Sequence, residues 1–421
     1  MNYEQALSYI HSVSWRGSRL GLSRTRELLE RLGNPEAGLP FVHIAGTNGK
    51  GSTAAMLSSI LTHAGYRTGL YTSPFINRFN ERMQIDGQCI PDETLAALTD
   101  AIRPVADAME DHPTEFELIT ALALRYFADE NCRIVVLETG MGGALDSTNA
   151  IPLPEVAVIT AMGMDHVREL GPTMADIARA KAGIIKAGGD VVSYGGNAEA
   201  DAVIARACAE RHARLVQPDF SAIRAGASGL HGQDFSYLDW EGLHLSLLGR
   251  YQLQNAALVL TVVETLRKRG WRIDDEAVRQ GLSAARWPAR FELLREHPVF
   301  LLDGGHNPHG IRATAESLSE LFPGRRVTLL MGVMADKELS GMLDSIAPLA
   351  ERCFTVRPDN PRAMDAASLA LRVSERGVPA VACSSVSEGV GRAIEAAGPE
   401  GIVCALGSLY LCGAVRACVL A

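Results

Sequence analysis

Short unbroken apolar runs alternate with longer amphipathic stretches along most of the chain. Runs such as 41–45 and 133–138 are typical of strands buried on both faces, and stretches such as 53–63 have the 3.6-residue spacing of helices. The same criteria predict strands at 66–73, 156–160, 190–194 and 214–217, and helices at 92–110, 115–129, 173–183 and 251–269. This alternation indicates a mostly parallel sheet covered by helices.

The pattern differs at both ends of this region. Residues 2–32 predict two short helices around the loop Trp15–Leu22, and 229–248 alternates as short strands joined by turns. At Trp287-Pro288-Ala289-Arg290 the αβ pattern restarts, with predicted strands at 298–303, 326–332, 352–356, 379–382 and 401–407. A length of 421 residues exceeds one compact core. We therefore predict an α/β protein with a P-loop domain, residues 1–288, and a smaller, doubly wound (Rossmann-like) domain, residues 289–421.

Composition narrows the class of partner. Apolar residues make up 47% of the chain, charged residues 21%, and the formal net charge is −9. This balance is typical of a globular protein and offers no basic surface for nucleic acid or anionic membrane. We find no secretory leader or membrane-length apolar run and expect a cytoplasmic protein. Eight cysteines without a C-x-x-C pair predict neither disulfides nor a zinc site. A small-molecule partner is favoured.

The segment Gly46-Thr47-Asn48-Gly49-Lys50-Gly51-Ser52 lies between an apolar strand and a helix. Glycines let successive amide groups converge on phosphate oxygens, and the helix N-terminus adds its positive dipole end. Lys50 would supply a point charge for the β and γ phosphates. The spacing differs from the common P-loop, since two residues separate Gly46 from Gly49-Lys50 and Gly51 precedes Ser52. A plain strand-to-helix turn is the alternative, but Lys50 directly after Gly49 favours nucleotide binding.

Polar residues follow three other predicted strands of this domain. Ser73, Glu138 and His166 all come at strand ends, which in a parallel sheet meet at the edge where ligands bind. A carboxylate, a hydroxyl and an imidazole beside phosphate oxygens suit Mg²⁺. Each residue also has a plainer interpretation: Glu138 as a strand-end acid turned to solvent, His166 as a turn residue, and Ser73 as part of a Ser-Pro turn.

The second domain has its own strand-end cluster, Asp303-Gly304-Gly305-His306-Asn307-Pro308. A plain turn between strand and helix explains it equally, and this applies to His306 in particular. Arg290, just past the predicted boundary, is either a phosphate ligand or a surface arginine. No second P-loop occurs there.

Together these features resemble the folylpolyglutamate synthase and dihydrofolate synthase family, within the ADP-forming Mur ligase superfamily. The similarity runs from Tyr3 to about Arg416. Besides the glycine loop, its carriers are Thr72-Ser73-Pro74, Asn80-Glu81-Arg82, Thr114–Glu117, Gly142-Gly143, Leu145–Asn149, Asp165-His166, Lys181–Lys186, Tyr251-Gln252, Asn255, Asp303, His306-Asn307-Pro308, Asp336-Lys337 and Gly407-Ser408.

The resemblance implies roles for individual residues. The glycine loop with Lys50 would hold ATP, and Asn255, Arg290 and Asp303 would contact the nucleotide. Ser73, Glu138 and His166 would bind Mg²⁺. Lys181 matches a carbamylated lysine that binds a second Mg²⁺, so Lys50, Lys181, His166 and His306 are the catalytic candidates. The residues that align with the pterin-binding surface are Phe116, Glu117, Leu145, Asp146 and Ser147.

The implied reaction is ATP-dependent ligation of L-glutamate to dihydropteroate, to reduced folates, or to both, through an acyl phosphate. The departures from the usual family pattern are Phe75 for a histidine, Ala144 for an arginine, Ala289 for a glycine, and Arg19 and Ser23 for acidic residues. They spare the nucleotide and metal set and fall near the substrate surfaces. Two alternatives stay open: a Mur-type ligase for another carboxylate and amine, and a nucleotide-dependent switch without ligase chemistry. We expect a monomer.

Overall fold

The computed structural model describes residues 1–14, 19 and 21–420. They divide into two compact units, one of Met1–Ser221 with Asn255–Ala284, and the other of Ala222–Gln254 with Ala285–Ala421. The second unit thus includes a segment that precedes residue 288. A domain boundary between residues 288 and 289 stays a prediction. Most of the predicted loop Trp15–Leu22 lies outside the described residues.

The first unit is built on an eight-stranded sheet with the order β4-β3-β2-β5-β1-β6-β7-β8. Strands β2 to β8 in this order are parallel, while β3 and β4 are antiparallel additions at one edge. The strands are β1 (Phe41–Ala45), β2 (Thr68–Tyr71), β3 (Met83–Ile85), β4 (Gln88–Cys89), β5 (Ile134–Glu138), β6 (Val156–Ile159), β7 (Asp190–Ser193) and β8 (Arg214–Val216).

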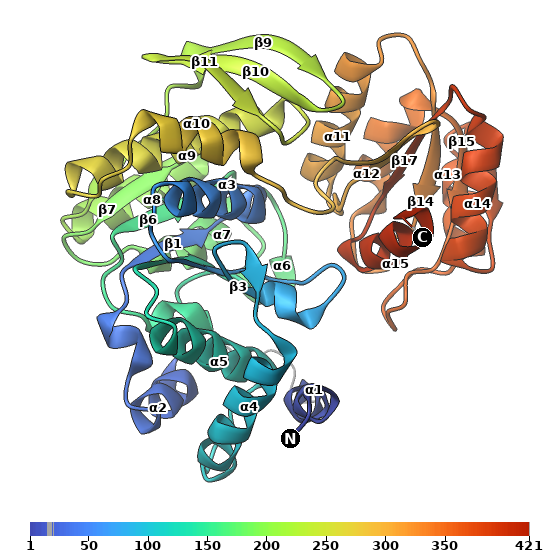
Figure 1. The fold of residues 1–421 in the computed structure, drawn as a ribbon. Helices are drawn as coiled ribbons and strands as arrows, with labels where there is room; N and C mark the ends of the chain where they lie inside the picture. Colours follow the sequence, from blue (N-terminus) through green and yellow to red (C-terminus); the bar gives the residue numbers. More distant parts are fainter. Residues whose placement is uncertain (15–18, 20, 421) are drawn as a thin grey trace. The chain divides into compact units, whose positions relative to one another are not determined.

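Helices cover both faces of this sheet (Figure 1). One core packs α1, α2, α4 and α5 against the face that carries Phe41, Val135 and Leu137, and α3 packs with α10 on the other side. The helices are α1 (Tyr3–Ser12), α2 (Ser23–Arg31), α3 (Lys50–His63), α4 (Asp92–Asp107), α5 (Glu115–Asp129), α6 (Val167–Leu170), α7 (Met174–Lys181), α8 (Ala198–Glu210), α9 (Tyr251–Lys268) and α10 (Asp275–Ala284), with 3₁₀ turns η2 (Pro35–Gly38), η3 (Phe79–Arg82), η4 (Ser147–Ala150), η5 (Ala182–Ile184) and η6 (Phe220–Ala222).

The second unit contains two sheets. A three-stranded antiparallel sheet is formed by β9 (Ile223–Gly229), β10 (Gly232–Tyr237) and β11 (Trp240–Leu245). The other sheet has the order β12-β13-β17-β14-β15-β16 and is parallel except for β12. Its elements are β12 (Glu292–Glu296), β13 (Val299–Leu302), β14 (Val327–Met331), β15 (Ala350–Thr355), β16 (Ala380–Ala382) and β17 (Ile402–Leu406), with α11 (Pro308–Leu321), α12 (Leu339–Ile346), η7 (Ala347–Leu349), α13 (Ala366–Ser374), α14 (Val386–Ala397) and α15 (Leu409–Leu420).

The predicted fold class is confirmed: a mostly parallel sheet lies in the first unit and a doubly wound sheet in the second. The prediction missed antiparallel additions, namely β12 and the hairpin of β3 and β4. With three and two residues, β3 and β4 are too short to show a period of two. Helix α3 also begins at Lys50, three residues before the predicted start, so its first turn is part of the glycine loop.

Among residues 1–14, 19 and 21–420, no helix has both the length and the apolar character that crossing a membrane requires.

A buried histidine lies in the middle of the first sheet. His43 of β1 is fully buried, and its Nε2 lies 2.9 Å from Thr148 Oγ1. The Thr148 hydroxyl donates to Asp146 Oδ1 (2.5 Å), so it accepts from His43 Nε2–H. His43 Nδ1 is buried without a hydrogen-bond partner. Burial, together with a smaller effect of the charge of Lys186, lowers the pKa of His43 to about 3. The imidazole is therefore neutral in the folded protein.

This histidine predicts a pH-dependent stability. Below about pH 6.5 the unfolded chain protonates His43 while the folded chain does not, so stability falls as pH decreases toward 3. The slope from this residue approaches roughly 1.4 kcal/mol per pH unit. We expect His43→Gln to remove that slope in urea titrations between pH 6.5 and 4, and His63→Gln, at an exposed helix end, to leave it intact. Equal slopes in wild type and His43→Gln would contradict this account.

Candidate active site

The glycine loop joins β1 to α3 with backbone angles that favour glycine. Gly46 has φ 153° and Gly49 has φ 86°. A Cβ on Gly46 would lie 1.9 Å from Thr160 Oγ1, and one on Gly49 would lie 2.7 Å from Asn255 Oδ1. The loop therefore has no room for a side chain at Gly46 or at Gly49. Its backbone lies in close contact with Thr160, which follows β6, and with Asn255 of α9. Gly49 precedes the 14-residue helix α3, whose N-terminal amides suit an anionic ligand.

The loop is also tied to the end of β6. The amides of Thr47 and Asn48 both donate to Ala161 O (3.1 Å each), and Thr47 Oγ1 donates to Gly163 O (2.9 Å). Gly51 and Ser52 begin the buried face of α3. The loop conformation is thus fixed by the sheet.

Two lysine side chains converge on one carbonyl of this loop. Lys50 Nζ donates to Gly46 O (3.2 Å) and Thr47 O (3.4 Å), and Lys181 Nζ donates to Gly46 O (2.7 Å). Lys181, the last residue of α7, is only 4% exposed. Burial, together with a smaller effect of the charge of Lys50, lowers the pKa of Lys181 to about 7. An ammonium group at such a site loses its proton readily and becomes a nucleophilic amine.

A buried carboxylate faces these lysines. Glu138 ends β5 and is 4% exposed, and its Oε1 lies 3.9 Å from Lys50 Nζ. Its Oε2 accepts from the amide of Ser73, which follows β2 (3.4 Å). Because β2, β5, β1 and β6 are adjacent and parallel, the predicted meeting of their carboxyl ends is confirmed. The structure brings Ser73, Glu138, Lys50 and Lys181 around the glycine loop.

His166 follows β6 at the same sheet edge. It is exposed, adopts a left-handed conformation (φ 51°), and its amide donates to Asp165 Oδ1 (2.9 Å). Its role as a metal ligand stays a prediction.

The donors at the sheet edge fit ATP and Mg²⁺. The buried hydroxyls of Thr139 and Thr160, at the ends of β5 and β6, have no hydrogen-bond partner. Together with the carboxylate of Glu138 they are the oxygen donors that a hard cation takes. Within the described part of the chain, no three His, Cys, Asp or Glu side chains are grouped to hold a metal. The predicted set of Ser73, Glu138, His166 and Lys181 contains only two residues of these types, and its roles stay predictions.

Of the residues predicted for the pterin surface, three are engaged in local structure. Glu117 is 2% exposed, accepts from the amide of Thr114 (2.7 Å) in a capping box at the start of α5, and pairs with Arg24 Nε (2.9 Å). Asp146 accepts from the amide of Met141 (2.8 Å) as well as from Thr148. Ser147 is buried at the start of η4.

The other two predicted residues shape the neighbouring loop. Phe116 packs against Gly140, since a Cβ there would lie 2.5 Å from the Phe116 ring. Leu145 is 49% exposed, and its carbonyl accepts from the amide of Gly21 (3.4 Å). Substrate contact by all five residues stays a prediction. Residue types alone did not reveal that His43 and Thr148 support Asp146, because a histidine inside an apolar run has the same pattern as any strand residue.

In the second unit the predicted residues gather around Gly304. Asp303 is buried and accepts from the amides of Phe291 (2.8 Å) and Gly305 (2.7 Å). Arg290 Nη1 donates to Ala289 O (3.1 Å), and His306 Nδ1 lies 2.9 Å from Gly304 O. Nucleotide contacts by Asn255, Arg290 and Asp303, and a catalytic role for His306, stay predictions.

Ala289 adopts a backbone conformation that favours glycine. It has φ 57°, a conformation that glycine adopts without strain, whereas alanine costs about 1 kcal/mol or more there.

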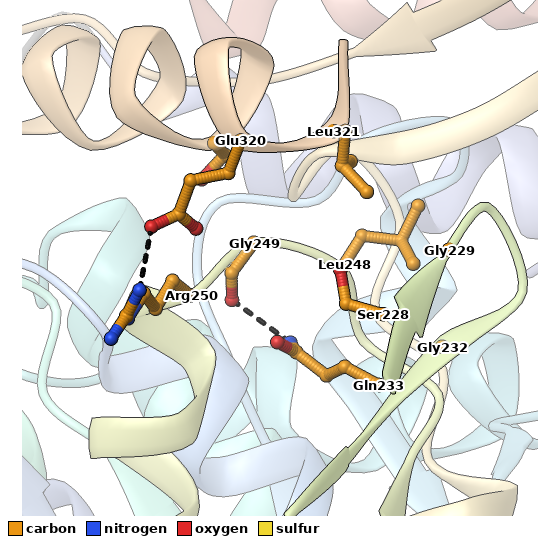
Figure 2. Close-up of a pocket in the computed structure, with 10 residues that line it drawn as sticks. Ser228, Gly229, Gly232, Gln233, Leu248, Gly249, Arg250, Glu320 and Leu321 are labelled. Carbon is orange, nitrogen blue, oxygen red and sulfur yellow. Dashed lines mark hydrogen bonds and ion pairs between the residues drawn. The ribbon is translucent and has the colours of Figure 1, made fainter. Parts of the chain in front are cut away.

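A pocket in the second unit lies apart from these residues. It is bounded by β9, β10, the segment before α9 and α11, and Figure 2 shows the ion pair of Arg250 Nη1 with Glu320 (2.9 Å) across it. Gln233 Nε2 donates to Gly249 O (2.9 Å) at its base. None of the predicted site residues lines it.

Comparison with known proteins agrees with this geometry. The Mur ligase middle domain matches residues 44–263, and the glutamate ligase domain of Mur ligases matches residues 289–409. A dihydrofolate synthase/folylpolyglutamate synthase of Bacillus subtilis is 39% identical and covers 98% of each chain. The chain belongs to the folylpolyglutamate synthase and dihydrofolate synthase family of Mur ligases.

Two further relatives illustrate the family. A folylpolyglutamate synthase of Lacticaseibacillus casei is 37% identical over 100% of this chain and 99% of its own. The folylpolyglutamate synthase of Mycobacterium tuberculosis, solved with ADP and AMPPCP, superposes with a TM-score of 0.90 at 31% identity over 99% of each chain. The enzyme class, an ADP-forming ligase, follows from this membership.

The close approach at Gly49 predicts the effect of adding a methyl group. We expect Gly49→Ala to lower the affinity for AMPPCP by at least about tenfold, because the Cβ meets Asn255 Oδ1 and displaces the loop. Gly33→Ala is the matched control, since Gly33 has a similar φ of 83° and open space around it. Calorimetric titration measures both. Unchanged affinity in Gly49→Ala would remove this loop from the nucleotide site.

Proposed function

We propose that the protein is an ATP-dependent ligase that joins L-glutamate to the carboxylate of a pterin substrate, either dihydropteroate, a reduced folate, or both. ATP phosphorylates the carboxylate to an acyl phosphate, and the α-amine of glutamate displaces phosphate to form an amide, so that ADP and phosphate are released. The observation that carries the proposal is the convergence of Lys50, Lys181 and Glu138 on the glycine loop.

We propose which residues of this site would hold the nucleotide and the metal. The loop amides and Lys50 would hold the phosphates, Ser73, Glu138 and His166 would bind Mg²⁺, and Lys181 would bind a second Mg²⁺ after carbamylation. When bound, Mg²⁺ supplies positive charge next to the phosphate oxygens. Lys50 adds a fixed cation that stabilises charge on the transferred phosphoryl group, and its burial beside Glu138 strengthens that interaction.

Lys181 is suited to carbamylation by its surroundings. Its buried Nζ donates a hydrogen bond to the carbonyl oxygen of Gly46, the residue that follows the end of β1. The neutral amine attacks the carbon of CO₂, one C=O electron pair moves to oxygen, and the proton of the amine leaves to water. The product is an anionic carbamate, which replaces a buried cation by an oxygen ligand for a metal.

Turnover of Mg-ATP with L-glutamate tests the proposed function. The assay compares 7,8-dihydropteroate with a tetrahydrofolate monoglutamate and identifies the products by mass. A gain of one glutamate residue on either acid, with one ADP released per bond, is expected. Products from both acids make the enzyme bifunctional. If neither acid accepts glutamate, the protein is another Mur-type ligase. ADP release that ignores every carboxylate and glutamate would instead indicate a nucleotide-dependent switch.

Lys181→Ala tests the carbamate. We expect ligation to be abolished because an oxygen ligand is lost, and to be partly restored by formate or acetate, which place a carboxylate in the vacated space. Lys186→Ala is the control: Lys186 is also partly buried, but its Nζ donates to the carbonyls of Asn149 and Ile151, so short carboxylates should have no effect on that variant. Full activity of Lys181→Ala without additives would disprove the assignment.

The cytoplasmic location and the monomeric state stay predictions from the sequence.

A further inference from the structure

Arg82 lies at the edge of the sheet where the parallel strands end, and no role has been assigned to it. It is the last residue of η3 and directly precedes β3, and its carbonyl accepts from the amide of Thr72 (3.1 Å). This bond fixes Arg82 beside the end of β2, one residue from Ser73. In the sheet order β3-β2-β5-β1, Glu138 of β5 then lies between the strand of Arg82 and that of the glycine loop.

Two aromatic rings hold the side chain of Arg82. Its guanidinium carbon lies 5.2 Å from the ring centroid of Phe75 and 5.7 Å from that of Phe79, and the two rings are 6.0 Å apart. Cation–π contacts of this kind orient a guanidinium group while leaving its N–H edge available. We call the arrangement of Phe75 and Phe79 around the guanidinium group the aromatic clamp.

The guanidinium group has no acidic partner among the described residues. Its Nε is buried and has no hydrogen-bond acceptor among the described residues. The one acid of the loop, Glu81, is already occupied, since it accepts from the amides of Ile76 (2.7 Å) and Arg78 (3.0 Å). A buried donor without a partner costs about 1–3 kcal/mol, so the fold maintains an unfavourable group at this position. Because no described carboxylate neutralises the guanidinium group, its positive charge can attract an anionic ligand.

We propose that Arg82, clamped by Phe75 and Phe79, binds the carboxylate of the acid substrate and holds it toward Ser73 and Glu138. The planar guanidinium fork matches the two oxygens of a carboxylate. The proposed phosphate cation is Lys50, which follows β1, and two strands, β2 and β5, separate β1 from β3 in the sheet. The identity of the acid as a pteroate or folate rests on the proposed function.

The experiment measures binding without turnover. Pteroate and its carboxamide, in which the charge is removed and the ring system retained, are titrated against wild type, Arg82→Gln and Arg78→Gln in the absence of ATP. We expect wild type to prefer the carboxylate by roughly ten- to hundredfold. Arg82→Gln should reduce that preference to within about twofold. Arg78→Gln should leave it unchanged, because Arg78 is exposed and already pairs with Asp92 (2.8 Å).

A preference that survives in Arg82→Gln would overturn the proposal. So would a loss of AMPPCP affinity in that variant with the carboxylate preference retained, because Arg82 would then serve phosphate. If Arg82→Gln does not fold, Phe75→Leu tests the same clamp and should lower the preference by about threefold. An unchanged preference in Phe75→Leu would then count against the clamp.

Failure of the proposed function is distinguishable from failure of this site. If the wild-type protein prefers the carboxylate but never joins glutamate to it, the proposed anion site stands and the proposed ligase function fails. If the wild-type protein ligates glutamate and Arg82→Gln has the same carboxylate preference as wild type, the proposed function stands and the proposed anion site fails. If the wild-type protein binds neither pteroate nor its carboxamide and joins glutamate to neither acid in the turnover assay, both proposals are overturned.

Discussion

The crowding of the Gly46 carbonyl constrains the rest of the first unit. Two lysine side chains donate to this one oxygen, and the Cα that carries it lies against the hydroxyl of Thr160. Such proximity requires β1 to lie between β5 and β6, so that Glu138 faces Lys50 on one side and the loop is tied to Ala161 on the other. Lys50 is the cation at this edge that suits a polyphosphate, because burial lowers the pKa of Lys181.

Burial gives these groups their chemistry. Lys181 near the protein surface would remain a solvated ammonium, whereas at 4% exposure its pKa falls to about 7. Burial likewise disfavours the charged form of Asp146 and raises the pKa of its carboxyl group, while hydrogen bonds from Thr148 and the amide of Met141 act in the other direction. These hydrogen bonds extend through Thr148 to His43 inside the sheet. A buried polar network of this kind is stable only when nearly every member is paired, which fixes the loop that follows Glu138.

How well the sequence predicted each part of the site depends on how far apart in the chain the interacting residues are. The strand ends at Ser73 and Glu138 were predicted because long apolar strands have a clear pattern and parallel strands end at one edge. The start of α3 at Lys50 was missed, because glycines favour no helix by themselves. Glu117 was predicted as a substrate residue, and its pairing with Arg24 depends on the packing of α2 against α5, which no local pattern records.

The sequence alone determined the αβ succession, the phosphate-binding character of the glycine loop and the family to which the chain belongs, because these depend on residues close together in the chain. Tertiary structure decided which groups meet. It placed Lys181 on the carbonyl of Gly46, 135 positions away, and set Arg82 between two aromatic rings without an acidic partner. Charge, burial and hydrogen bonding act over a few ångströms in space, and only the folded chain brings such distant residues within that range.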